Sequence, residues 1–169
     1  MSRVSKIKWL GIVERHGNGL ELIKEAGDCV LVERGYPRSF LFKCPDGCGD
    51  VITINLDPAS GPAWKFYVRN GLRTLYPSVA LTTGCQSHFI LWRDDILFCE
   101  GEGYRGNIAI DKALLATAYN GLQQTQLHFS ELALQIGELP WEVLWACREL
   151  VRTGHAKEIR IGYFVRRIK

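Results

Sequence analysis

Hydrophobic and polar residues alternate with the two-residue period of β-strands through residues 1–100. Turn signals separate the alternating runs, among them HGNG, AGD, Asn70-Gly71 and Asp94-Asp95. Asn-Gly between two β-rich runs is the strongest short-range signal for a hairpin. We therefore expect strands within KIKWLGIV (6–13), LELI (20–23), CVLVE (29–33), SFLFKC (39–44), VITINL (51–56), WKFYV (64–68), LRTLY (72–76), SVALTTGCQSHFILW (78–92) and ILFCE (96–100).

The pattern changes to a helical period after residue 107. Asp111 is a suitable N-cap for a helix over 110–123. Ser130 is expected to open a second helix that Gly137 can end. Pro140 suits the first position of a third helix, which closes at Gly154. The final run, HAKEIRIGYFVRRIK, alternates again and predicts a β-hairpin around Gly162 or a single strand pair.

These elements predict an α+β chain with two domains. Residues 1–100 would form a small antiparallel β-domain, and the glycine-rich GEGYRGN (101–107) would be a linker. The order of elements in 108–169 is that of a winged helix-turn-helix. The stretch FSELALQIGELPWEVLWACRELVRTGHA resembles that superfamily, whose pattern is so widespread that it identifies a fold more than a task.

Composition limits the binding partners and the cellular location that we expect for the chain. The chain has 169 residues, 47% of them hydrophobic, and a formal net charge of +3, which is too mild to imply nucleic acid or a membrane surface. No apolar run approaches the length of a membrane span, and the N-terminus lacks the apolar core of a signal peptide. We therefore expect a cytoplasmic protein, in which thiols stay reduced and clustered cysteines indicate metal or catalysis before disulfides.

Two of the cysteine motifs have the spacing of metal half-sites. Cys44 and Cys48 lie in KCPDGCGD, and Cys85 and His88 lie in TTGCQSH. Zinc takes four thiolate or imidazole ligands, and a tight turn can aim two of them at one ion. We expect one structural zinc bound by Cys44, Cys48, Cys85 and His88. A simple turn pair and a redox pair remain as alternatives, although the usual redox spacing is C-x-x-C at a helix start.

Evidence for an enzyme is weak in the sequence. Four ligands with three sulfurs favour a closed metal site without a position for water, although Asp46 and Asp50 lie nearby. Ser87 precedes His88 directly, and adjacent side chains in a strand point apart. The other histidines are scattered, with no acid or nucleophile at a telling spacing: His16, His128 and His155.

The N-terminal motifs also carry a resemblance. FKCPDGCGDVITINL, a Trp, the Asn-Gly hairpin, LYPSV, GCQSHFILWRDD and ILFC together resemble a family of uncharacterised bacterial metal-binding proteins over residues 30–100. Genes of that family often lie beside genes for ubiquitin-like conjugation. The resemblance implies metal ligands at Cys44, Cys48, Cys85 and His88 and a setting in such a pathway, but it implies no reaction.

The third predicted helix and the hairpin after it offer two binding surfaces. One helix face carries aromatic and basic residues, a composition typical of protein interfaces, although it could equally dock within the chain: Trp141, Trp145, Arg148 and Arg152. The hairpin carries five basic residues that could contact phosphates or simply be solvated: Lys157, Arg160, Arg166, Arg167 and Lys169. A DNA-reading helix usually begins with polar residues, whereas this one begins with Trp141 and Glu142.

Two hypotheses follow. The first is a non-enzymatic adaptor that presents these surfaces to protein partners, including ubiquitin-like conjugation components. The alternative is a winged-helix DNA-binding regulator with a structural zinc.

Overall fold

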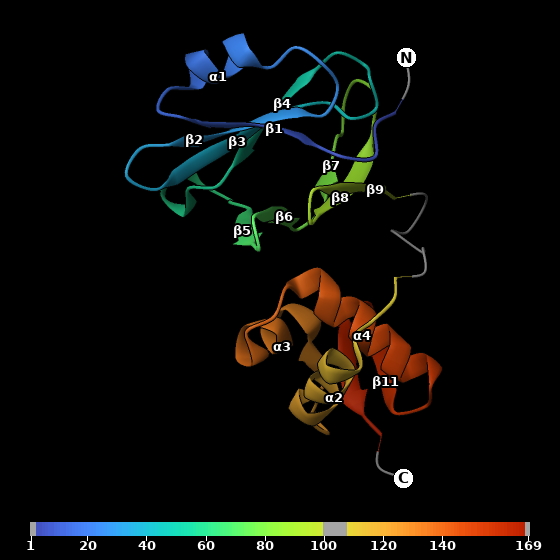
Figure 1. Cartoon of the computed structure of the whole chain (residues 1–169). Coiled ribbons are helices and arrows are strands. Elements are labelled where there is room, and N and C mark those ends of the chain that lie inside the picture. The colour runs from blue at the N-terminus through green and yellow to red at the C-terminus, as the bar shows by residue number, and fades with distance from the viewer. Residues whose placement is uncertain (1–2, 100–107, 168–169) are drawn as a thin grey trace. The chain divides into compact units, whose positions relative to one another are not determined.

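The chain divides into two compact units, residues 1–105 and residues 106–169. The computed structural model describes residues 3–99 and 108–167 (Figure 1). The predicted linker at 101–107 lies outside the described residues, so each unit is considered by itself.

The first unit is built from nine strands and two short helices in the described residues. In chain order they are β1 (Lys8–Val13), α1 (His16–Leu22), β2 (Asp28–Glu33), β3 (Pro37–Lys43), β4 (Val51–Asn55), η1 (Pro58–Ser60), β5 (Lys65–Arg69), β6 (Leu72–Tyr76), β7 (Val79–Ala80), β8 (His88–Trp92) and β9 (Asp95–Phe98).

The largest sheet has the order β1-β2-β3-β4, and β1 and β2 pair in parallel. Parallel neighbours need a crossover connection, and α1 supplies it. The prediction of a strand at LELI (20–23) was therefore wrong, because most of this segment belongs to α1. The expectation of a purely antiparallel domain fails at the same place; the other strand pairs in the described residues are antiparallel.

Alternation along the strands fills two different cores. Val30, Val32 and Leu41 point to the face that α1 covers (Figure 1), where Ile23 joins them. The intervening residues of the same strands point to the opposite face, which packs on β6 and the β7-β8-β9 sheet: Cys29, Leu31, Phe40 and Phe42. The period-two pattern of the sequence thus separates the two faces of one sheet.

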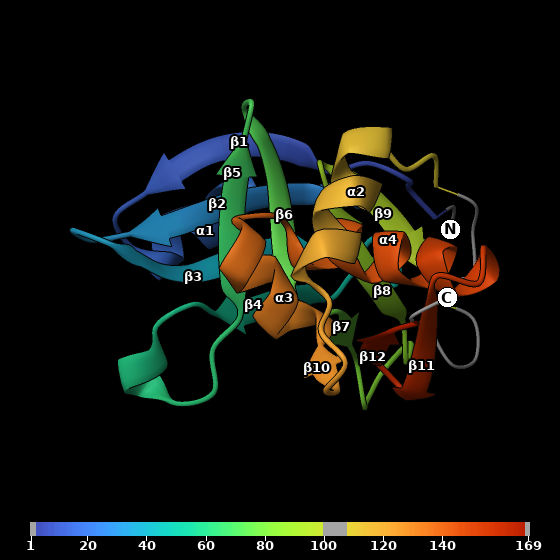
Figure 2. The same cartoon turned by 90° about the horizontal axis from the view of Figure 1, so that it is seen from below.

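The hairpin β5–β6 and the sheet β7-β8-β9 complete the unit (Figure 2). The Asn70-Gly71 turn joins β5 to β6, as predicted, and both residues have positive φ (53° and 75°). Arg73 of β6 holds the Asp94 carboxylate through two hydrogen bonds of 2.8 and 2.7 Å. This half-buried pair fastens the hairpin to the β8–β9 turn.

The second unit contains three helices and a three-stranded sheet in the described residues. Its elements are α2 (Lys112–Gly121), β10 (Leu127–His128), α3 (Phe129–Ile136), α4 (Pro140–Arg152), β11 (Ala156–Arg160) and β12 (Tyr163–Arg166), with sheet order β10-β12-β11. This order agrees with the sequence expectation, while the identity of a winged helix stays a prediction.

Three of the predicted helix boundaries are confirmed and one is wrong. Asp111 caps α2 by accepting the Ala113 N–H, Gly137 ends α3 with φ 70°, and Pro140 begins α4. Ser130 does not cap α3, because the helix begins at Phe129 and the His128 ring accepts the Ser130 N–H at 3.3 Å. The cap is a histidine, which a search for Ser, Thr, Asp and Asn misses.

Candidate active site

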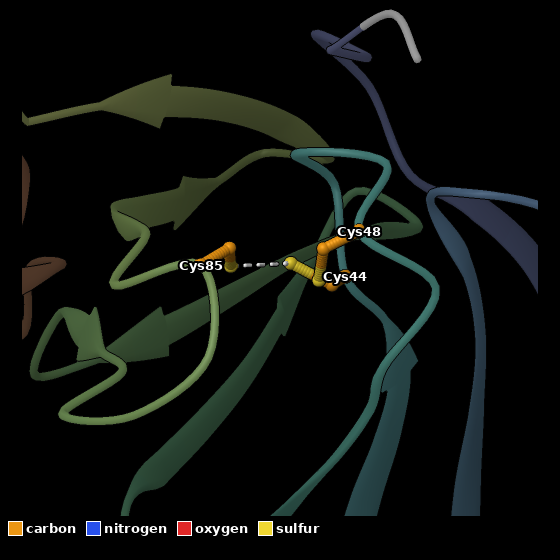
Figure 3. Close-up of side chains that lie close together, drawn as sticks. All are labelled: Cys44, Cys48 and Cys85. Carbon is orange, nitrogen blue, oxygen red and sulfur yellow. Dashed lines mark hydrogen bonds between the residues drawn. The ribbon is translucent and has the colours of Figure 1, made fainter.

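Three thiols come together between two loops of the first unit (Figure 3). Cys44 and Cys48 lie on the loop between β3 and β4, and Cys85 lies on the loop between β7 and β8. The three sulfur atoms all lie within 4.8 Å of one another, and Cys44 Sγ is 3.6 Å from Cys85 Sγ. These three residues can hold a metal ion.

Backbone geometry explains why the first loop presents two thiols in one direction. The Cys44 N–H donates to Asp50 O (2.9 Å) and the Gly47 N–H donates to Cys44 O (3.2 Å), which closes a tight loop at the end of the hairpin. Gly47 adopts φ 82°, a conformation that residues with a Cβ rarely take. The sequence KCPDGCGD therefore folds as the turn that its proline and glycines predicted.

The chemistry of the thiols fits a metal ion. Burial is the largest cause that raises the pKa of Cys44 to about 12, and hydrogen bonds with the Cys48 and Cys85 thiols act in the same direction. Cys44 is buried and the other two cysteines are partly exposed. Three thiols this close together are stable as neutral S–H groups or as thiolates around a cation. Soft sulfur ligands favour zinc among the common protein metals.

His88, the fourth predicted ligand, does not belong to this sulfur group. Its Nε2 atom lies 3.0 Å from the hydroxyl oxygen of Ser78 instead. The structure thus brings together three of the four predicted ligands and gives the histidine a different partner.

Strand register explains how Ser78 and His88 meet. Ser78 directly precedes β7, and His88 is the first residue of β8. Val79 pairs with Phe89 and Ala80 pairs with His88, so Ser78 and His88 are diagonal neighbours on one face of the antiparallel pair. Such diagonal positions lie within reach of a long side chain.

Neighbouring groups fix the backbone of both residues. The Trp64 indole Nε1–H donates to Ser78 O at 3.3 Å, and the Cys99 N–H donates to His88 O at 2.8 Å. The Tyr76–Pro77 peptide before Ser78 is cis. Both side chains of the pair are half-buried and thus accessible from solvent. In the described part of the chain, no hydrogen-bond partner is found for Nδ1 of His88.

A serine hydroxyl within hydrogen-bond distance of an imidazole is the minimum for nucleophilic catalysis. The distance of 3.0 Å lies within the range of an activated nucleophile and its base. With the proton on Nδ1, Nε2 accepts the Ser78 O–H. The loop that carries Cys85 leads directly into His88, so the thiol group and the serine–histidine pair share one connection.

The sequence reasoning missed Ser78. The serine next to His88 in the sequence is Ser87, whose hydroxyl is buried and has no hydrogen-bond partner among the described residues. Ser78 is ten positions from His88, across a loop whose length hides the pairing. The signal that could have found it is the alternation of SVA and HFI, because two short antiparallel strands place every second residue on one face.

The first unit thus combines a small β-domain, a group of three close thiols and a serine–histidine hydrogen bond. A family model matches residues 15–99, just over half of the 169 residues, and its description is "Bacterial ubiquitination-like system serine protease (BubE)". The chain belongs to this family, which links it to a bacterial ubiquitination-like system. No curated protein and no solved structure matches it.

The predicted binding surfaces of the second unit lie outside the matched residues. Trp141 and Trp145 are only 6% and 7% exposed, and the Trp141 ring stacks against Phe129 at 6.4 Å between centroids. Arg148 is half-buried, and Arg152 is exposed and paired with Glu149. A partner-binding role for this face stays a prediction, and it requires that a partner uncover both indoles.

Four of the predicted phosphate-binding residues lie on or directly after the β11–β12 hairpin: Lys157, Arg160, Arg166 and Arg167. Arg160 lies over the Tyr163 ring and Arg166 over the Tyr119 ring. Lys157 is exposed, and Lys169 lies outside the described residues. DNA binding thus stays a prediction as well. In the part of the chain that is described, no helix is long and apolar enough to cross a membrane.

Proposed function

We propose that this protein is a serine protease that cleaves acyl bonds to a ubiquitin-like modifier, with Ser78 as the nucleophile and His88 as the general base. The hydrogen bond of 3.0 Å between Ser78 Oγ and His88 Nε2 is the observation that carries the proposal. Membership of the family supports both the chemistry and the setting.

The reaction would follow the usual steps of acyl transfer. Ser78 Oγ attacks the carbonyl carbon while its proton passes to His88 Nε2. The C–N bond to the leaving amine breaks, and His88 returns the proton to that amine. Water then attacks the acyl ester, again with His88 as base, and the carboxylate leaves as Ser78 regains its proton.

In this proposal the three thiols have a structural role. Cys44, Cys48 and Cys85 would hold one zinc ion, which ties the β7–β8 loop to the β3–β4 loop. A metal ion that ties two loops together in this way contributes folding free energy. It would fix the segment that ends at His88 and thereby the distance from the imidazole to Ser78.

The other candidate roles explain less. A non-enzymatic adaptor agrees with a place in the same system but leaves the accessible serine–histidine pair without a use. A DNA-binding regulator would rest on the second unit, whose third helix has buried tryptophans where base-reading side chains are expected. Neither role is favoured by a contact in the first unit.

The test is cleavage of a defined fusion. The purified protein is mixed with the ubiquitin-like protein of the same system, fused at its C-terminus to a small reporter protein. We expect release of the reporter, and we expect Ser78→Ala and His88→Gln to stop it while both variants stay folded. Unchanged cleavage by Ser78→Ala, or no cleavage by the unaltered protein with a correctly folded fusion, would overturn the proposal.

A further inference from the structure

The strand that follows Ser78 lies at the edge of its sheet. The order of the sheet is β7-β8-β9, so β8 covers one side of β7 and leaves the other without a strand in the described residues. Ala80, its last residue, is exposed. An edge strand presents backbone groups that can pair with another chain.

The alternation of hydrogen-bonded and non-hydrogen-bonded pairs between β7 and β8 determines which backbone groups face this edge. The Leu81 N–H donates to Ser87 O at 2.9 Å, so residues 81 and 87 form a hydrogen-bonded pair. Ala80 and His88 are the next pair, and in an antiparallel ladder the two kinds of pair alternate. Ala80 therefore directs its N–H and its C=O away from β8.

Two independent bonds confirm this alternation. His88 O accepts the Cys99 N–H at 2.8 Å, so the peptide groups of His88 face β9 and not Ala80. Ser78 lies two residues before Ala80, so its backbone N–H and C=O also point away from β8. Its carbonyl oxygen accepts the Trp64 indole N–H on that side. The first N–H and C=O pair along the edge that can accept a partner strand thus belongs to Ala80.

We propose that the acyl segment of the substrate binds as an extended strand, antiparallel to β7, and that Ala80 N–H and C=O hold the residue two positions before the acyl residue. This inference rests on the proposed function of Ser78. Antiparallel pairing is the only direction that works, because it brings the C-terminal end of the substrate strand to Ser78.

The proposal implies a particular kind of specificity. Recognition through backbone groups depends little on side chains and requires an extended, unfolded acyl segment such as a protein tail. The amine that leaves lies beyond Ser78 and does not touch β7. The site would thus select the acyl partner by its extended form and accept many amine partners.

The experiment compares two kinds of serine-directed probe on the full chain. An alkyl fluorophosphonate tests only the reactivity of Ser78. A tripeptidyl phosphonate, acetyl-Ala-Ala-Ala with phosphorus in place of the last carbonyl, also tests strand pairing. We measure labelling rates for this probe and for two versions that are N-methylated at its first or its second alanine.

The effect of N-methylation on the labelling rate should alternate from one residue of the probe to the next. Methylation of the first alanine, opposite Ala80, should slow labelling about tenfold, as the loss of one or two hydrogen bonds predicts. Methylation of the second alanine should change little, because its N–H points away from β7. Ala80→Pro should slow the tripeptidyl probe similarly, whereas Ala80→Val, which keeps the N–H, should not.

The outcomes separate the two proposals. Equal rates for the three peptidyl probes, with normal labelling by the alkyl probe, would overturn strand pairing and leave Ser78 as nucleophile. Failure of the alkyl probe to label Ser78 would overturn the proposed function and this inference with it. If Ala80→Pro does not fold, the methylation series on the unaltered protein decides alone.

Discussion

The described residues contain two serine–histidine hydrogen bonds, one in each unit. His88 Nε2 lies 3.0 Å from Ser78 Oγ, and His128 Nδ1 lies 2.7 Å from Ser130 Oγ. The shorter contact belongs to the pair that we do not consider catalytic.

The two pairs differ in what holds them. Ser130 follows His128 by two residues, and the same imidazole nitrogen accepts the Ser130 N–H as the cap of α3. The His128 ring is also enclosed by the rings of Phe129 and Tyr163, at 4.5 and 4.8 Å between centroids. Nδ1 of His128 therefore accepts a backbone N–H and caps the helix α3.

Ser78 and His88 come from different strands and meet only through the register of a sheet. The imidazole nitrogen there contacts no backbone N–H in the described residues, and the loop between the two residues carries a thiol of the sulfur group. A distance alone therefore does not identify a nucleophile. The position of the pair in the fold and the competing uses of the imidazole matter more.

The largest expected effect separates the two pairs by activity. Ser78→Ala should reduce cleavage of the modifier fusion at least about a thousandfold, because loss of a nucleophile removes the whole covalent route. Ser130→Ala is the matched control and should leave the rate unchanged. A comparable loss in both variants would mean that the comparison is mistaken.

The next effect concerns the metal. Elemental analysis of the purified protein should give about one zinc per chain. Cys85→Ser should lose most of that zinc and lower both the melting temperature and the cleavage rate, because the β7–β8 loop is released. Cys99→Ser is the control outside the sulfur group and should keep the zinc. A stable, active protein without metal would end this part of the account.

A smaller effect tests the sheet that supports the first pair. Gly19 of α1 leaves no room for a side chain, since an added Cβ would lie 2.5 Å from Leu41 Cδ1 and 2.9 Å from Val30 Cγ2. Gly19→Ala should destabilise the first unit by about 1–3 kcal/mol. An added Cβ at Gly17 of the same helix has no described atom within 4 Å. Gly17→Ala should therefore stabilise the unit by about 0.5–1 kcal/mol. Denaturant titration of both variants measures the difference.

The smallest effect concerns the pair of His128 and Ser130 in the second unit. His128→Ala should cost the second unit about 1 kcal/mol through the lost cap. Burial lowers the pKa of His128, with the charge of Arg160 in the same direction and that of Glu131 opposing it. The unfolded chain then binds a proton first, so stability should fall as the pH drops below about 6.5. Thermal unfolding at several pH values should show this slope in the unaltered chain and a weaker one in His128→Ala.

Local signals in the sequence were enough for most of the fold. Alternating runs, Asn70-Gly71, Asp111 and Gly137 each act within a few residues, and the corresponding elements are present. The predictions failed where the structure of a segment depends on residues far away in the sequence. LELI forms part of a crossover helix because β1 pairs with β2 in parallel, a pairing that no local pattern in LELI reveals.

The residues of the candidate site were likewise predicted where the signal is local and missed where it depends on distant residues. Cys44, Cys48 and Cys85 were predicted because paired ligands within tight turns are local features. Ser78 was missed because its significance depends on the register of β7 with β8 across a loop. His88 was predicted as a metal ligand, and in the structure its imidazole lies 3.0 Å from the Ser78 hydroxyl instead.

The most direct test of the central claim is the site of reaction with an alkyl fluorophosphonate, read by peptide mass mapping of the intact, metal-replete protein. We predict one adduct, on Ser78, that is lost in His88→Gln and retained in Ser130→Ala. An adduct on Ser130 or Ser87, or no adduct at all on a folded chain, would contradict the assignment of Ser78 and His88 as nucleophile and base.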